Sequence, residues 1–85
     1  MKHAGPAALD GIEPLLADIR AAAPTLVEKS RGVFYRRSKA FLHFHEDPTG
    51  MYADVRVGDD FERFAATTAE DRAALVERIA ALVSA

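Results

Sequence analysis

The feature of this chain that most limits its fold is the separation of its aromatic residues from its alanines. All seven Phe and Tyr residues lie between positions 34 and 64, whereas only Ala40 and Ala53, of 17 alanines, lie between 24 and 64. Aromatic side chains favour strands and alanine favours helices. The middle of the chain is therefore predicted to form a sheet and its two ends helices, which is an α+β arrangement.

Length and charge exclude several classes of protein. The 85 residues allow one small domain, which we expect over 10–85, with 1–9 as a flexible N-terminal tail. A net charge of −2 gives no whole-chain argument for binding nucleic acid or an anionic membrane. The chain has no cysteine, which excludes disulfides and thiolate-bound metals. Neither a signal-peptide core nor an apolar run of membrane-spanning length is present, so a cytoplasmic protein is expected.

Two amphipathic helices are predicted at the ends of the chain. The first covers about 10–22, where apolar residues recur at helical spacing until Pro24 ends the pattern. The second covers about 68–83 and opens with a capping box formed by Thr67 and Glu70. Both helices are expected to pack on one face of the sheet, giving a two-layer sandwich.

The middle segment predicts an antiparallel meander of about three strands, at 33–36, 40–45 and 51–57. The sequence Asp-Pro-Thr-Gly at 47–50 is typical of a type I turn between the last two. Residues 25–32 are polar and indicate an irregular connection. Phe61 and Phe64 are three residues apart, which favours a short helical turn or a loop held against the core.

The predicted turn at 47–50 sets a register that separates the sheet into two faces. In this register His43 faces Asp54, and His45 faces Tyr52. One face is apolar and meets the helices. The other face is predicted to be an interaction face, and its members are Phe34, Phe41, His43, His45, Tyr52, Asp54 and Arg56. Aromatic residues mixed with arginine and histidine are typical of interfaces, so we expect this face to bind a second copy, a protein partner or a ligand.

The same face carries a candidate metal site. His43 and His45 are two apart on one strand and point the same way, with Asp54 opposite His43. Two imidazoles and a carboxylate suit zinc or iron. Asp54 has a second interpretation as an acceptor that orients a histidine. The alternative is an ordinary cross-strand pair on a solvated face.

A basic cluster offers a different surface, made of Arg31, Arg36, Arg37 and Lys39. A basic hairpin tip with aromatics nearby can contact phosphate and stack on bases. The alternative is a solvated tip whose charges protect a strand edge. The acidic total charge favours the alternative, so nucleic acid is not the expected partner.

No residues indicate an enzyme. A phosphate-binding glycine loop, a serine elbow and a nucleophile with a base at diagnostic spacing are all missing from the sequence. The leading hypothesis is therefore a non-enzymatic binding domain without a cofactor. Metal binding and nucleic-acid binding are its alternatives.

The order of segments resembles a family of small bacterial domains. A helix leads into APTLVEK at 23–29, then GVFY at 32–35, a basic hairpin with Lys39, further strands and a final helix. This order is similar to the YdhG/YjbR-type domains, which are grouped structurally with the bacterial frataxins. The resemblance implies an α+β fold and, for some members, DNA binding or iron delivery. A frataxin-type role would need a strongly acidic first helix, and this helix has few acidic residues.

Overall fold

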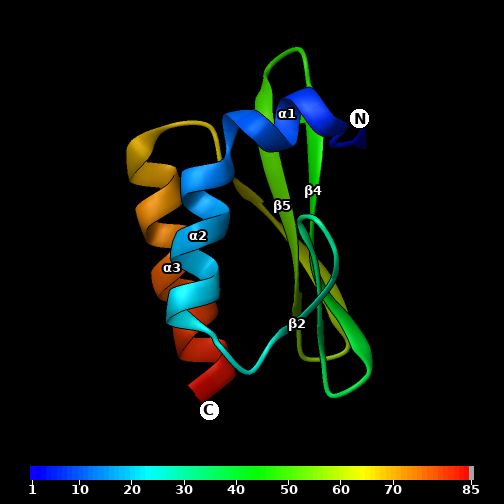
Figure 1. The fold of residues 1–85 in the computed structure, drawn as a ribbon, viewed down its shortest axis with the longest axis vertical. Coiled ribbons are helices and arrows are strands. Elements are labelled where there is room, and N and C mark those ends of the chain that lie inside the picture. Colours follow the sequence, from blue (N-terminus) through cyan, green and yellow to red (C-terminus); the bar gives the residue numbers. More distant parts are fainter. Residues whose placement is uncertain (85) are drawn as a thin grey trace.

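The computed structural model describes residues 1–84, and the predicted sheet with terminal helices forms within them (Figure 1). Helices α2 and α3 lie side by side along one face of an antiparallel sheet. The elements follow one another as β1 (Lys2–His3), α1 (Pro6–Gly11), α2 (Glu13–Ala22), β2 (Val27–Ser30), β3 (Val33–Arg36), β4 (Lys39–Asp47), β5 (Gly50–Val57), β6 (Asp60–Ala65) and α3 (Ala69–Ser84).

The sheet is larger than the three-stranded meander expected from the sequence. Strands β2 to β6 are hydrogen-bonded in chain order, and β1 pairs with β4. The segment expected as an irregular connection contains β2, and the segment expected as a helical turn or loop is β6. Strand alternation explains the spacing of Phe61 and Phe64, because two residues three apart on a strand point to opposite faces.

The predicted register of the β4–β5 hairpin is confirmed. His43 pairs with Asp54 and His45 with Tyr52. Asp47 accepts hydrogen bonds from the backbone N–H and the hydroxyl of Thr49, which stabilises the turn. A turn of known geometry fixes which residues share a face, and the positions of the histidines follow from it.

The β3–β4 hairpin contains a bulge that no sequence pattern predicts, and the bulge changes the positions of two phenylalanines. Tyr35 pairs with Ala40, but Phe34 pairs with Leu42, so one extra β4 residue is accommodated between these pairs. Such a bulge reverses the alternation on one side of it. Phe34 therefore shares the face of Leu42, and both Phe34 and Phe41 are buried in the core. The prediction that they lie on the exposed interaction face is wrong.

The helices begin at slightly different places from those expected. The first is divided at Ile12 into α1 and α2, because Pro14 lacks the N–H that would continue α1. Helix α3 begins at Ala69, and its cap differs from the predicted capping box. The Asp71 carboxylate accepts hydrogen bonds from the backbone N–H groups of Thr67 and Thr68. The Thr68 hydroxyl in turn accepts a hydrogen bond from the backbone N–H of Asp71. The cap therefore uses Thr68 and Asp71 in place of Thr67 and Glu70.

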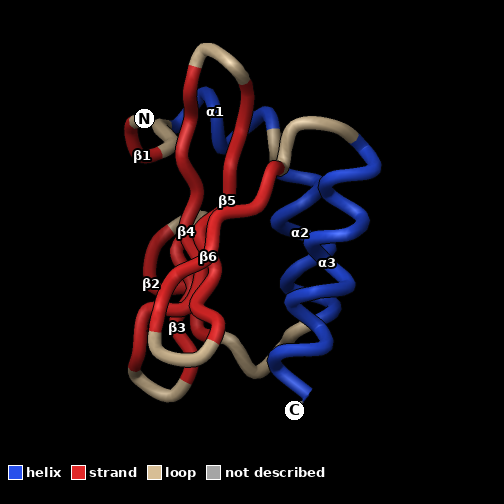
Figure 2. Tube along the Cα trace, turned by 180° about the vertical axis from the view of Figure 1, so that it is seen from behind, coloured by secondary structure: helices blue, strands red, loops and turns tan. Residues whose placement is uncertain are grey.

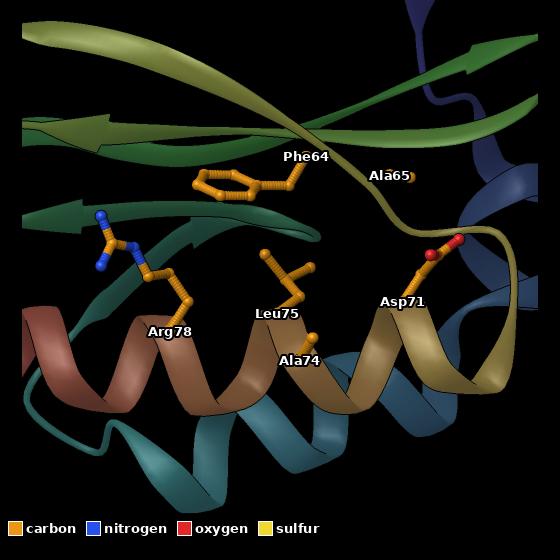
Figure 3. Close-up of a pocket in the computed structure, with 6 residues that line it drawn as sticks. All are labelled: Phe64, Ala65, Asp71, Ala74, Leu75 and Arg78. Carbon is orange, nitrogen blue, oxygen red and sulfur yellow. The ribbon is translucent and has the colours of Figure 1, made fainter.

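The core lies between the two helices and the sheet (Figure 2). Helix α2 buries Leu16 and Ile19 there, and α3 buries Leu75 and Ile79. Figure 3 shows the ring of Phe64 projecting from β6 toward Leu75, beside a cavity of about 350 Å³. Within residues 1–84, no helix has the combined length and apolar character that crossing a membrane requires.

Candidate metal centre

The two histidines of β4 lie on the face of the sheet that the helices leave open, here called the outer face. Their neighbours Leu42 and Phe44 are buried in the core beneath the helices. Alternation along the strand places His43 and His45 on the opposite side. Strand β4 thus contributes apolar residues to the core on one face of the sheet and imidazoles to the outer face.

A third histidine reaches this face from the N-terminus, where a flexible tail was expected. Strand β1 pairs with β4 so that His3 lies directly beside His45. The pairing continues where the N–H of Ala4 donates to the carbonyl of Phe44 at 3.0 Å. Glu46 holds the following residue, because its Oε2 accepts the N–H of Gly5 at 2.7 Å. These contacts place residue 3 on the outer face.

The three imidazoles form one cluster. The ring of His3 is stacked on that of His45 with centroids 4.7 Å apart, and His43 lies edge-on to His45 at 5.1 Å. One nitrogen from each of the three rings lies within 4.8 Å of the other two. In a tetrahedral zinc site the same separation is about 3.3 Å, given Zn–N bonds of about 2.0–2.1 Å. Closing the cluster on an ion needs a shift of about 1–2 Å, and the exposed ring of His3 has room to move.

Several nitrogens of the cluster have no hydrogen-bond partner. Among residues 1–84, Nδ1 of His43 and both ring nitrogens of His45 are buried and form no hydrogen bond. Buried polar atoms without partners are rare and call for an explanation. Burial lowers the pKa of His43, partly offset by the Asp54 carboxylate, and the other two histidines lower it further. A neutral imidazole with a free lone pair is the form that binds a metal ion.

Asp54 lies beside the cluster and is held by an arginine. Its two oxygens accept from Nε and a terminal nitrogen of Arg63 at 2.8 and 2.9 Å. This bidentate pair lowers the pKa of Asp54, although burial opposes the effect. Oδ2 also lies 3.0 Å from Nε2 of His45, without the alignment of a hydrogen bond. Because Arg63 occupies both oxygens, the arrangement favours Asp54 as a residue that orients His45 over Asp54 as a ligand.

An aromatic side chain closes one side of the cluster. Phe61 lies edge-on to His43, with centroids 5.0 Å apart, and the guanidinium carbon of Arg56 lies 4.7 Å from the centre of the same phenyl ring. Tyr52, the cross-strand neighbour of His45, shares a hydrogen bond with Thr49. An apolar neighbour such as Phe61 limits water access to the imidazoles and strengthens their interaction with an ion.

The predicted basic cluster is divided in the structure. Arg31 lies away from the hairpin tip and pairs with Asp10 and Glu13 at 2.6 and 2.8 Å. Arg36, Arg37 and Lys39 stay together and are joined by Arg56, which the sequence placed on the interaction face.

The site residues that sequence reasoning missed are His3 and Arg63. His3 was assigned to the tail, and Arg63 to a segment that was not expected to be a strand. The residues Phe-Glu-Arg-Phe-Ala at 61–65 show no period-two alternation that would have marked a strand, and only the β5–β6 pairing places Arg63 opposite Asp54. The sequence holds no signal for His3 either.

No family of known proteins, no curated protein and no solved structure matches this chain. The resemblance to the YdhG/YjbR-type domains stays a prediction.

Proposed function

We propose that this protein binds a divalent transition-metal ion, with zinc as the reference ion, through His3, His43 and His45. The observation that carries the proposal is the convergence of three imidazoles whose nitrogens lie within 4.8 Å of one another. Two of the three residues also hold buried nitrogens without hydrogen-bond partners. A metal ion would give Nδ1 of His43 and Nδ1 of His45 a partner that the protein does not, whereas Nε2 of His45 already faces Asp54 at 3.0 Å.

The arrangement supports a site with an open position. Three protein ligands leave one tetrahedral position of zinc for water or another molecule. His3 is exposed, so this position would be on the solvent side of the cluster. We propose the binding of the ion itself as the function of this site.

The surrounding residues support the same function. Asp54, fixed by Arg63, would hold the ring of His45 in one orientation. The pairing of β1 with β4 would bring the third ligand. The site therefore depends on two features that a metal-free role would not require together: an anchored N-terminal strand and a fixed carboxylate beside a histidine.

Binding of a second copy or a protein partner through the outer face is a weaker alternative. Two of the aromatics that suggested it, Phe34 and Phe41, are buried in the core. Phe61 and Val27 are exposed on this face, with 40% and 57% of their surfaces accessible, but they lie on β6 and β2, at opposite edges of the sheet, and form no joint patch. A single exposed aromatic is ordinary on a protein surface.

Calorimetric titration with zinc chloride tests the proposal, using protein purified without a polyhistidine tag. We expect one zinc ion to bind per chain. His3→Ala and His43→Ala each remove a ligand, so each should lower zinc affinity by more than the roughly 10–100-fold that is lost when a residue supporting a ligand is removed. Lys2→Arg is the matched control, since it alters the same strand without removing an imidazole or the positive charge that faces Glu46. Wild-type protein that binds no zinc, or a His3→Ala variant that binds it normally, would overturn the proposal.

A further inference from the structure

A cavity of about 340 Å³ lies at the beginning of β4, where Lys39 and Phe41 precede the histidines along the strand. It is bounded by the β3–β4 hairpin, the end of β5 and the last turns of α3. Its walls combine four cationic side chains with two apolar ones. The cationic ones are Arg36, Arg37, Lys39 and Arg56, and the apolar ones are Phe41 and Leu82. This volume falls at the lower end of the range for small-molecule sites, which is about 300–1,000 Å³.

Three of the cations around this cavity have no carboxylate partner in the described part of the chain. Among residues 1–84, Arg37, Lys39 and Arg56 form no ion pair with a carboxylate. The guanidinium of Arg56 donates to the backbone carbonyls of Ala40 at 2.7 Å and Asp59 at 3.4 Å. By contrast, Arg63 pairs with a carboxylate. Three uncompensated cations beside one cavity produce a local field that attracts an anion.

The backbone at this cavity is unusual in a second way. The hairpin tip places Arg37 and Ser38 in the left-handed region, with φ values of 51° and 71°. Two-residue hairpin turns with this geometry favour asparagine and glycine, because larger side chains are strained there. Strain of this kind concentrates at binding sites. Here the conformation of the turn sets how Arg36, the last residue of β3, and Lys39, the first residue of β4, lie next to each other.

The bulge in β4 supplies the apolar wall. It brings Phe41 into the core, where this residue borders the cavity with only 2% of its surface exposed, and Leu82 of α3 lines the same cavity. Arg36 also contacts α3, since its guanidinium donates to the carbonyl of Val83 at 3.4 Å. A flat ring or short apolar chain can pack against Leu82 and the small exposed part of Phe41 while the cations surround its charged end.

We propose that this cavity binds the phosphate monoester of a small aromatic or apolar compound. A phosphate monoester carries between about −1.5 and −2 charges at neutral pH, which matches several cations better than a single carboxylate does. Arginine also recognises phosphate through paired hydrogen bonds. The cavity accommodates one ring-sized group, so a single small ligand fits it better than a nucleic-acid strand.

Titration of the full chain with phenyl phosphate at low salt, followed by two-dimensional NMR, tests this proposal. We expect saturable one-to-one binding, with shifts in the amides of residues 36–41 and 56–58. Inorganic phosphate and benzoate should bind more weakly, since one lacks the ring and the other the second charge. Lys39→Ser and Arg56→Gln should each weaken phenyl phosphate binding by roughly tenfold or more, as expected for hydrogen bonds to a charged group. Arg78→Ala, which removes one positive charge from α3, should leave affinity unchanged.

Three results would overturn the proposal. Inorganic phosphate binding as well as phenyl phosphate would show that the apolar wall contributes nothing. Benzoate binding as tightly as phenyl phosphate would exclude the phosphate assignment. A single-stranded oligonucleotide that binds more tightly than phenyl phosphate would make this a nucleic-acid surface. Leu82→Glu, a variant whose folding is checked by circular dichroism, should abolish binding by placing a carboxylate among the cations.

Discussion

His3 stacks on His45 with their ring centroids 4.7 Å apart and their planes inclined by 30°, although one comes from the first residues of the chain and the other from the middle of the sheet. Backbone pairing between the same two residues makes this contact. The candidate metal centre therefore depends on how firmly the short β1 strand is attached, and the attachment can be tested separately from the ligands.

Glu46 is the residue that attaches the N-terminus. Its carboxylate accepts the N–H of Gly5 at 2.7 Å and lies 3.7 Å from the Lys2 ammonium. We expect Glu46→Ala to weaken zinc binding by releasing His3, while the free energy of unfolding falls by only about 1 kcal/mol. Calorimetry and urea unfolding measure the two effects. Glu46→Gln keeps an acceptor and should lose less zinc affinity than Glu46→Ala; equal losses in the two variants would contradict this role.

Asp54 is expected to act through His45 instead of binding the ion. The variant Asp54→Asn keeps the shape of the side chain but removes the negative charge that Arg63 holds. Its zinc affinity should fall by about 10–100-fold, the usual cost of losing an outer residue, as calorimetry would measure. The control is Asp59→Asn at the exposed β5–β6 turn, which should bind as the wild type does. Unchanged affinity in Asp54→Asn would remove Asp54 from the site.

The ion pair between Arg20 and Glu28 predicts a pH dependence of stability. Hydrogen bonds from Arg20, and one from the N–H of Gly32, lower the pKa of Glu28 below its ordinary 4.5, although burial opposes them. The pair therefore stabilises the fold above about pH 4.5, and this contribution is lost as the pH falls through the folded-state pKa. Arg20 keeps 38% of its side chain exposed, so solvent screening limits the effect to about 1 kcal/mol.

Glu28→Gln tests this dependence, because glutamine still accepts from Gly32. The variant should be less stable than the wild type at pH 7, and the difference should shrink toward pH 3. Urea unfolding at both values measures it. Glu77→Gln on the exposed side of α3 should match the wild type throughout. A difference for Glu28→Gln that grows on acidification would reverse the assigned sign.

Gly32 is predicted to tolerate a side chain less well than Gly58. Its φ is +79°, and a Cβ there would lie 2.7 Å from Cδ2 of Leu9. Gly58 has a similar φ of +69° but nothing within 4 Å. Gly58→Ala should therefore cost about 1–2 kcal/mol from backbone strain alone, and Gly32→Ala more than that. Thermal unfolding gives both values, and equal costs would show that Leu9 moves aside freely.

The parts of the fold that the sequence predicts correctly depend on local patterns. The turn at 47–50 fixed the β4–β5 register, which placed His43, His45 and Asp54 correctly relative to one another. Helical spacing located α3 to within one or two residues. In each case neighbouring residues carry the information, because turn geometry and side-chain period act over short distances.

The parts that were missed depend on contacts between distant segments. The bulge that buries Phe34 and Phe41 arises from the way β3 and β4 are paired, and no local pattern marks it. The two residues of β1 are too few to show a strand period, so the recruitment of His3 follows only from its pairing with β4. Two imidazoles of the candidate site could therefore be predicted from the sequence, and the third could not.

The measurement that tests the metal centre most directly is a long-range proton–nitrogen NMR spectrum of the imidazoles with and without zinc. The chain contains three histidines, so every imidazole signal belongs to a proposed ligand. At one equivalent of zinc, one nitrogen of each ring should move to the position of a metal-bound nitrogen, and further zinc should change nothing. A spectrum in which the His3 ring keeps its metal-free nitrogen signals at one equivalent would contradict the three-histidine site.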